Sequence, residues 1–113
     1  MTAGTKKLLL DVREAGDSIL QHTQGRTLAE YSADRFFRRA VEREFEIIGE
    51  ALNRLDRLDA NMATRITELR RIVDFRNRIT HGYDSVDDRV VWGVIEKHLP
   101  LLVEQVRGLL DKS

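Results

Sequence analysis

Cysteine is absent from the 113 residues, and proline occurs once, at Pro100. Without cysteine the chain has no disulfide bonds and no thiolate metal sites, which is compatible with a reducing compartment. No apolar run approaches the roughly 20 residues of a membrane span, and the segment before Lys7 lacks the apolar stretch of a signal peptide. We therefore expect a cytoplasmic protein without a membrane segment.

The length predicts one domain, over residues 1–113, with a hydrophobic core. The scarcity of proline, with 42% hydrophobic and 34% charged residues, is typical of a helical protein with solvated outer faces.

The formal net charge is zero, which argues against a general affinity for polyanions. The positive charge is nevertheless uneven, because residues 35–78 hold 11 Arg against 8 acidic residues. Arginine binds phosphate well through its planar fork, although exposed ion pairs along helices are the more common use of such residues.

Apolar residues at three-to-four spacing predict a first helix that is capped by Thr5 and ends near residues 21–24. Thr27 and Glu30 form the sequence pattern of a capping box, which predicts a short helical turn after it.

A long helix with a broad apolar stripe is expected over residues 35–58, capped by Ser32 or Asp34. Gly49 lies in its middle, where glycine costs about 1 kcal/mol relative to alanine. A close approach to another helix, within the chain or across a dimer, would explain the glycine.

A further helix is predicted from about residue 63 to residue 80 or 81. Asp87 or Asp88 should cap the last helix, Trp92 should lie at a partly covered edge, and Pro100 should kink or restart that helix. The final segment is more apolar than one face of a small bundle needs, which suggests contact with a second chain. These four main helices and the short helical turn predict an all-α antiparallel bundle.

The reactive side chains gather in one stretch, Arg76-Asn77-Arg78-Ile79-Thr80-His81-Gly82-Tyr83. On a helix, Arg76, Thr80 and Tyr83 share one face, and Asn77 and His81 stack one turn apart. The first three side chains fall where the apolar face should continue, and such a break in the local pattern tends to mark a functional site. A plain helix end is the alternative, because Arg and His suit the last turn and Gly82 can close it.

The residue types in this stretch suit metal-independent RNA cleavage. That reaction needs a base for the 2′-hydroxyl, an acid for the leaving oxygen, and a cation for the charge that builds on the phosphate. Arg76 can supply the cation, His81 can move a proton near neutral pH, and Asn77 can hold His81 or a phosphate oxygen. One histidine cannot easily do both proton transfers, whereas a symmetric dimer would offer two.

Other chemistries fit less well. The sequence has no metal-ligand motif, no glycine-rich phosphate loop and no serine or cysteine nucleophile motif, so we expect no metal and no cofactor. The three histidines, His22, His81 and His98, are expected on different helices or at their far ends. Three acidic residues could bind a cation, although helix capping is their commoner role: Asp84, Asp87 and Asp88.

The stretch matches the pattern R-N-x-x-x-H-x-Y and resembles the HEPN-domain ribonucleases of the HepT-like toxin family. Further segments along nearly the whole chain look like that family: Ala33-Asp34-Arg35, Phe45-Glu46-Ile47-Ile48-Gly49-Glu50-Ala51, Ile72-Val73-Asp74-Phe75, Val90-Val91-Trp92 and His98-Leu99-Pro100.

The resemblance implies a homodimer with a metal-independent endoribonuclease site in the dimer cleft. Arg76 and His81 would be catalytic, and Asn77 would support them. Thr80 is not part of the family pattern, but we expect it to support the site because it shares a helix face with Arg76. It also implies a partner, an MntA-type nucleotidyltransferase antitoxin of a type VII toxin–antitoxin system, which transfers AMP from ATP to Tyr83. The added charge and bulk would compete with the RNA phosphate for Arg76.

Two other functions remain open from the sequence. The chain could be a non-catalytic module that docks a nucleotidyltransferase and offers a nucleotide or phosphate pocket through Arg76 and Tyr83. It could also be a purely structural dimerisation domain.

Overall fold

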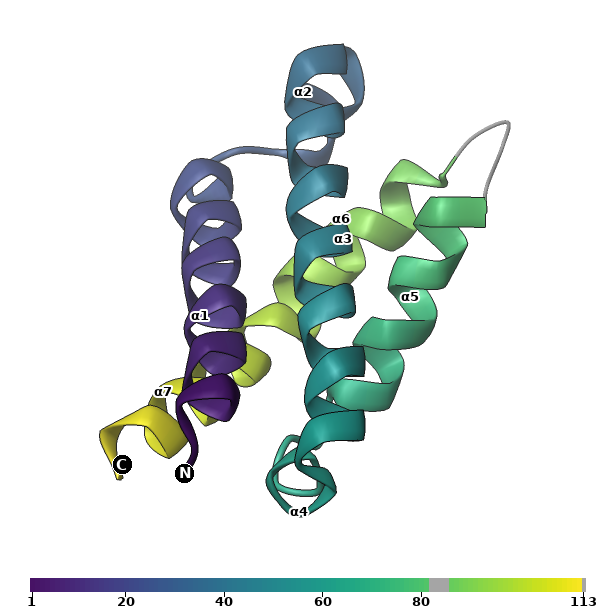
Figure 1. Ribbon diagram of the computed structural model, residues 1–113. Helices are drawn as coiled ribbons and strands as arrows, with labels where there is room; N and C mark the ends of the chain where they lie inside the picture. The colour runs from purple at the N-terminus through teal and green to yellow at the C-terminus, as the bar shows by residue number, and fades with distance from the viewer. Residues whose placement is uncertain (82–85, 113) are drawn as a thin grey trace.

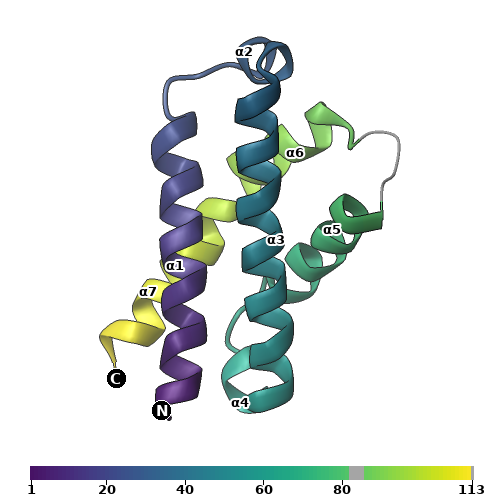
Figure 2. The same cartoon turned by 45° about the horizontal axis from the view of Figure 1, so that its top comes forward.

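The computed structural model describes residues 1–81 and 86–112, which form seven helices and no strand (Figure 1). The helices are α1 (Ala3–Thr23), α2 (Leu28–Ala33), α3 (Arg35–Leu58), α4 (Ala60–Ala63), α5 (Leu69–His81), α6 (Asp88–Lys97) and α7 (Leu99–Asp111). The all-α prediction is confirmed. α1 and α5 pack on α3, and α7 packs on α1. The start of α1 and the end of α7 lie at the same end of the molecule (Figures 1 and 2).

The first helix begins earlier than the sequence indicated. Thr2 caps α1, because its hydroxyl accepts a hydrogen bond from the Thr5 backbone N–H at 3.1 Å. Thr5 itself is buried and donates its hydroxyl proton to Asp59 Oδ2 at 3.2 Å. The prediction that Thr5 is the cap is therefore wrong, since Thr5 ties α1 to the end of α3 instead.

The next two helix starts follow their local signals. The capping box before α2 is confirmed, with Thr27 and Glu30 each bonding to the other's backbone N–H. Of the two predicted caps for α3, Asp34 is the one used, because its carboxylate accepts from the Phe37 N–H at 3.0 Å. α3 then spans the predicted residues.

The prediction of one helix from about residue 63 is wrong in its first part. Asp59 caps the short helix α4, which ends at Ala63, and α5 begins only at Leu69. Between them the Thr67 backbone N–H donates to the Gln105 side chain of α7 at 3.0 Å. A residue far along the chain thus replaces the helical hydrogen bond that local periodicity predicted.

The last helical region breaks at the proline, as predicted. α6 is capped by Asp87 and ends at Lys97, and Pro100 is the second residue of α7. Trp92 is only 8% exposed, with its ring centroid 5.4 Å from that of Tyr31. The prediction of a partly covered edge is wrong because α2 covers this side of α6.

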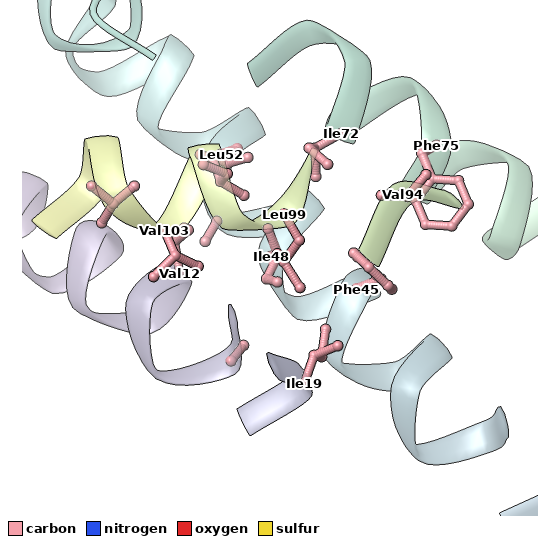
Figure 3. Packing of buried hydrophobic residues seen from close by; sticks show 14 of the residues in the cluster. Val12, Ile19, Phe45, Ile48, Leu52, Ile72, Phe75, Val94, Leu99 and Val103 are labelled. Atoms are coloured by element: carbon pink, nitrogen blue, oxygen red, sulfur yellow. The ribbon is translucent and has the colours of Figure 1, made fainter. Parts of the chain in front are cut away.

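One hydrophobic cluster joins the helices, and Figure 3 shows part of it. Its labelled members come from α1, α3, α5, α6 and α7: Val12, Ile19, Phe45, Ile48, Leu52, Ile72, Phe75, Val94, Leu99 and Val103. Most apolar residues of α7 are buried in this chain, namely Leu99, Leu102, Val103, Val106, Leu109 and Leu110. They are not available to a second chain, so the apolar surplus of α7 gives no support for a dimer.

Within the described residues, no helix is both long and apolar enough to cross a membrane.

Candidate active site

The last two turns of α5 carry the predicted site residues that the structure describes. Arg76 is half-buried, whereas Asn77, Thr80 and His81 are exposed. Gly82 and Tyr83 lie outside the described residues. The apolar face of α5 does not stop after Phe75, because Ile79 is only 8% exposed. Arg76 is therefore the one polar interruption of that face, and Thr80 is not part of it.

Gly49 of α3 makes room for Arg76. A β-carbon at position 49 would lie 2.3 Å from Arg76 Cβ and 2.4 Å from Arg76 Cγ, which is far inside any real contact. The arginine stem thus lies directly against the α3 backbone. The predicted close approach at Gly49 is confirmed, and it occurs within one chain.

The Arg76 guanidinium has little to neutralise it. Its Nη1 donates to Asn77 Oδ1 at 3.2 Å, and its Nε is buried without an acceptor in the part of the chain that the structure describes. Arg76 also forms no ion pair with a described residue. A buried donor and an unpaired cation are both stabilised by an incoming anionic oxygen.

Asn77 and His81 line one cleft of about 520 Å³, with Phe75, Arg78 and Val86 among its walls. Arg76 and Thr80 do not line this cleft. Arg76 is connected to it through Asn77, which lines the cleft and accepts the guanidinium hydrogen bond. No hydrogen bond involves the Thr80 side chain within residues 1–81 and 86–112, so its supporting role has no contact behind it.

The other two histidines have local structural partners. His22 Nδ1 lies 2.7 Å from the Ser18 carbonyl oxygen, one turn earlier in α1. His98 Nδ1 lies 3.0 Å from Glu68 Oε2, which connects the end of α6 to the start of α5. His81 has no such partner among the described residues, which leaves its ring free for a ligand.

Asp87 has a structural role. Its side chain accepts the Arg89 backbone N–H at 2.9 Å, and this bond is the main reason why the pKa of Asp87 is below its usual value. Asp84 lies outside the described residues. In the described part of the chain, no group of three His, Cys, Asp or Glu side chains is placed to hold a metal ion.

Sequence patterns alone did not indicate which residue Gly49 contacts, and they did not single out Arg78. The partner of Gly49 is Arg76 on another helix, so no local pattern could indicate the pair. Arg78 lines the His81 cleft, one turn before that histidine on α5. Its place inside the motif stretch was the only available signal.

Comparisons with known proteins agree on one family. Residues 12–109 match the model of a family described as "Ribonuclease HepT-like". The chain is 29% identical over 102 residues to "Probable ribonuclease HepT" of Thermococcus cleftensis, covering 90% of this chain and 92% of that protein. It is also 29% identical over 95 residues to "Putative RNase TTE0752" of Caldanaerobacter subterraneus, covering 84% of each.

A third relative is longer. The chain is 26% identical over 112 residues to "Gamma-glutamylcyclotransferase and putative RNase MJ0434" of Methanocaldococcus jannaschii, covering 99% of this chain but 50% of that protein. No solved structure matches the chain significantly.

Proposed function

Because this chain belongs to the HepT-like ribonuclease family, we propose that it is a metal-independent endoribonuclease that uses Arg76 and His81. One observation supports these roles most directly. Arg76 occupies a core-facing position that Gly49 keeps open, yet no described residue neutralises its charge. Its neighbour Asn77 connects it to the cleft that His81 lines.

The proposed reaction is an intramolecular transesterification, in which the RNA's own 2′-hydroxyl attacks the neighbouring phosphodiester. The 2′-hydroxyl oxygen loses its proton and attacks the adjacent phosphorus, and the bond to the 5′-oxygen breaks as that oxygen gains a proton. The products are a 2′,3′-cyclic phosphate and a 5′-hydroxyl. Arg76 stabilises the negative charge on the phosphate oxygens, and His81 transfers a proton.

A second chain completes the site in this proposal. The reaction has two proton transfers, and each chain brings one histidine to the cleft. An exposed His81 at a helix end is free to meet the same segment of a partner, as the two-fold symmetry of a homodimer allows. The proposed dimer would place two arginines and two histidines around one phosphate.

Regulation is proposed to act on Tyr83, two residues after His81 in the sequence. The chain would be the toxin of a toxin–antitoxin pair, and an MntA-like nucleotidyltransferase would transfer AMP to the Tyr83 hydroxyl with release of pyrophosphate from ATP. The new phosphodiester charge would compete with RNA for Arg76. Intact-mass measurement with and without that enzyme should show gains in AMP units on Tyr83. A mass gain on other residues only would contradict this part.

The activity itself is tested with purified protein and RNA in excess EDTA. The proposal predicts fragments with 5′-hydroxyl ends, and no cleavage of the same RNA with 2′-O-methyl groups throughout. If the protein shifts the mobility of RNA without cutting it, the chain is a binding module and not a nuclease. Cleavage of the 2′-O-methyl RNA would contradict attack by the 2′-hydroxyl.

A further inference from the structure

A second cleft lies between α5 and α6, and its walls are mainly basic. Its volume is about 520 Å³, and four basic side chains line it, Arg71, Arg78, Arg89 and Lys97. Asp74 is the single acidic residue among its lining side chains. This concentration of positive charge is notable in a chain whose net charge is zero.

The cleft exists because α5 and α6 pack on different neighbours. α5 packs on α3, whereas α6 packs on α2 and α7 (Figure 1). The two helices therefore form the walls of a groove that no other described element fills. The apolar floor comes from side chains such as Phe75 and Val94.

The positive charge of this groove is only partly neutralised. Arg71 Nε lies 3.4 Å from Glu68 Oε2, and Arg89 Nε lies 3.5 Å from Asp87 Oδ1. Arg78 and Lys97 have no ion-pair partner among the described residues. Two cations on opposite walls are thus left for an external anion, which is the arrangement that phosphate groups favour.

The groove is continuous with the candidate active site. Phe75, Arg78 and Val90 line both this cleft and the cleft that contains His81. Along α5, Arg71 and Arg78 are two turns apart, or about 10 Å at 1.5 Å per residue. The basic residues of the groove therefore continue along α5 for about 10 Å beyond Arg78, away from His81.

We propose that this groove binds the phosphodiester backbone of the RNA strand on one side of the bond to be cut. The inference rests on the proposed function, because it takes RNA as the ligand. A basic groove that follows the backbone is how many proteins hold single strands, and arginine can bind phosphate bidentately. Such contacts carry no base preference, so they position the strand without selecting its sequence.

The test measures binding separately from cleavage. The probe is a fluorescent single-stranded RNA with 2′-O-methyl groups throughout, which the proposed mechanism cannot cut. Its dissociation constant is measured by anisotropy at several salt concentrations. The variant is Arg78→Gln with Lys97→Gln, because neither substitution breaks an ion pair between described residues.

The slope of log affinity against log salt is negative, and each lost phosphate contact should reduce its magnitude by about 0.7. The double variant should therefore have a slope that is shallower by about 1.4. Its dissociation constant should rise on the order of tenfold at 0.15 M salt. The matched control is Lys6→Gln with Arg54→Gln, which removes the same two charge types from exposed positions on α1 and α3. The control should bind like the wild type, and circular dichroism should show both variants folded.

An unchanged slope and affinity in the folded Arg78→Gln/Lys97→Gln variant would overturn the groove proposal, even if the wild type cleaves RNA. An equal loss in the control variant would also overturn it, because the effect would then be one of overall charge. If the double variant binds RNA normally but loses a protein partner, the groove is a protein interface and the proposal is wrong. Salt-dependent binding through the groove without any cleavage would instead reject the ribonuclease function alone.

Discussion

Gly49 and Arg76 meet at one contact between α3 and α5, and each explains the other. A glycine in the middle of a 24-residue helix costs helix stability, and an arginine on a core-facing position costs desolvation. The close contact of the arginine stem with the α3 backbone links the two. We infer that both costs are retained because they hold the guanidinium beside Asn77, which lines the cleft that contains His81.

Replacing Gly49 with alanine should disturb stability and activity together. The added methyl group would collide with the Arg76 stem, so the free energy of unfolding should fall by about 1–3 kcal/mol and RNA cleavage should decrease. Urea denaturation and a cleavage assay measure the two effects. Gly108→Ala is the control, because a β-carbon there meets nothing within 4 Å and should be neutral or stabilising. Equal behaviour of the two variants would contradict this role for Gly49.

Tyr31 is a second residue whose surroundings are unusual. Its side chain is fully buried against Phe37 and Trp92, and its hydroxyl has no hydrogen-bond partner within the described residues. Burial, reinforced by the charges of Glu42 and Asp88, raises the pKa of Tyr31 far above its ordinary value. The phenol therefore ionises more readily in the unfolded chain than in the folded one.

This difference gives a pH-dependent prediction. Since the folded-state pKa is raised, ionisation of Tyr31 in the unfolded chain should reduce stability as the pH rises through about 10. Tyr31→Phe removes that loss and also the unpaired hydroxyl, so at pH 7 it should leave stability unchanged or raise it by up to about 1 kcal/mol. Thermal denaturation of both proteins from pH 7 to pH 11 tests this. A Tyr31→Phe variant that is clearly less stable at pH 7 would show that the hydroxyl has a partner.

At the scale of the helices, the sequence predicted the features that local signals determine. The capping box at Thr27, the extent of α3 and the break at Pro100 all depend on neighbouring residues, and all are confirmed. The late start of α5 depends on Gln105, 38 residues after its partner Thr67, so no local pattern could indicate it. The burial of Trp92 likewise depends on the packing of α2 against α6.

For the candidate site too, some features follow from the local sequence and others depend on how the helices pack. The sequence placed Arg76, Asn77 and His81 at the end of one helix, as the structure does. It did not indicate that Asn77 and His81 share a cleft while Arg76 lies against α3, because this depends on how α5 packs. Thr80 was expected on the core face, but Ile79 takes that place.

Asp59 connects three helices, α1, α3 and α4. One carboxylate oxygen caps α4 through the Met62 N–H, at 3.1 Å, and the other accepts from Thr5 of α1 at 3.2 Å. Asp59→Ala should lower the free energy of unfolding by about 1–2 kcal/mol, as loss of a helix cap does. Asp59→Asn keeps an acceptor oxygen and should lose less in urea denaturation. If both variants lose the same amount, the cap is not the source of the stability.

For the whole molecule, we propose that the reaction takes place at a site shared by two chains. One chain has a mass of 13.1 kDa and brings one histidine to the cleft. We expect light scattering to show a particle of twice that mass under the conditions in which RNA is cut. When the protein is diluted below the dimer dissociation constant, the cleavage rate should then fall more steeply than the protein concentration. If the protein is a monomer and its cleavage rate stays proportional to its concentration, the composite site is contradicted.

We propose that Arg76 and His81 carry out RNA cleavage, and the decisive measurement is the cleavage rate in excess EDTA. The wild type is compared with Arg76→Ala and His81→Ala, and with Arg54→Ala and His22→Ala as matched controls at exposed positions. Each site variant should stay folded and lose at least about 100-fold in cleavage rate, while the controls should cleave like the wild type. If either folded site variant cleaves RNA at the wild-type rate, the proposed roles of Arg76 and His81 are contradicted.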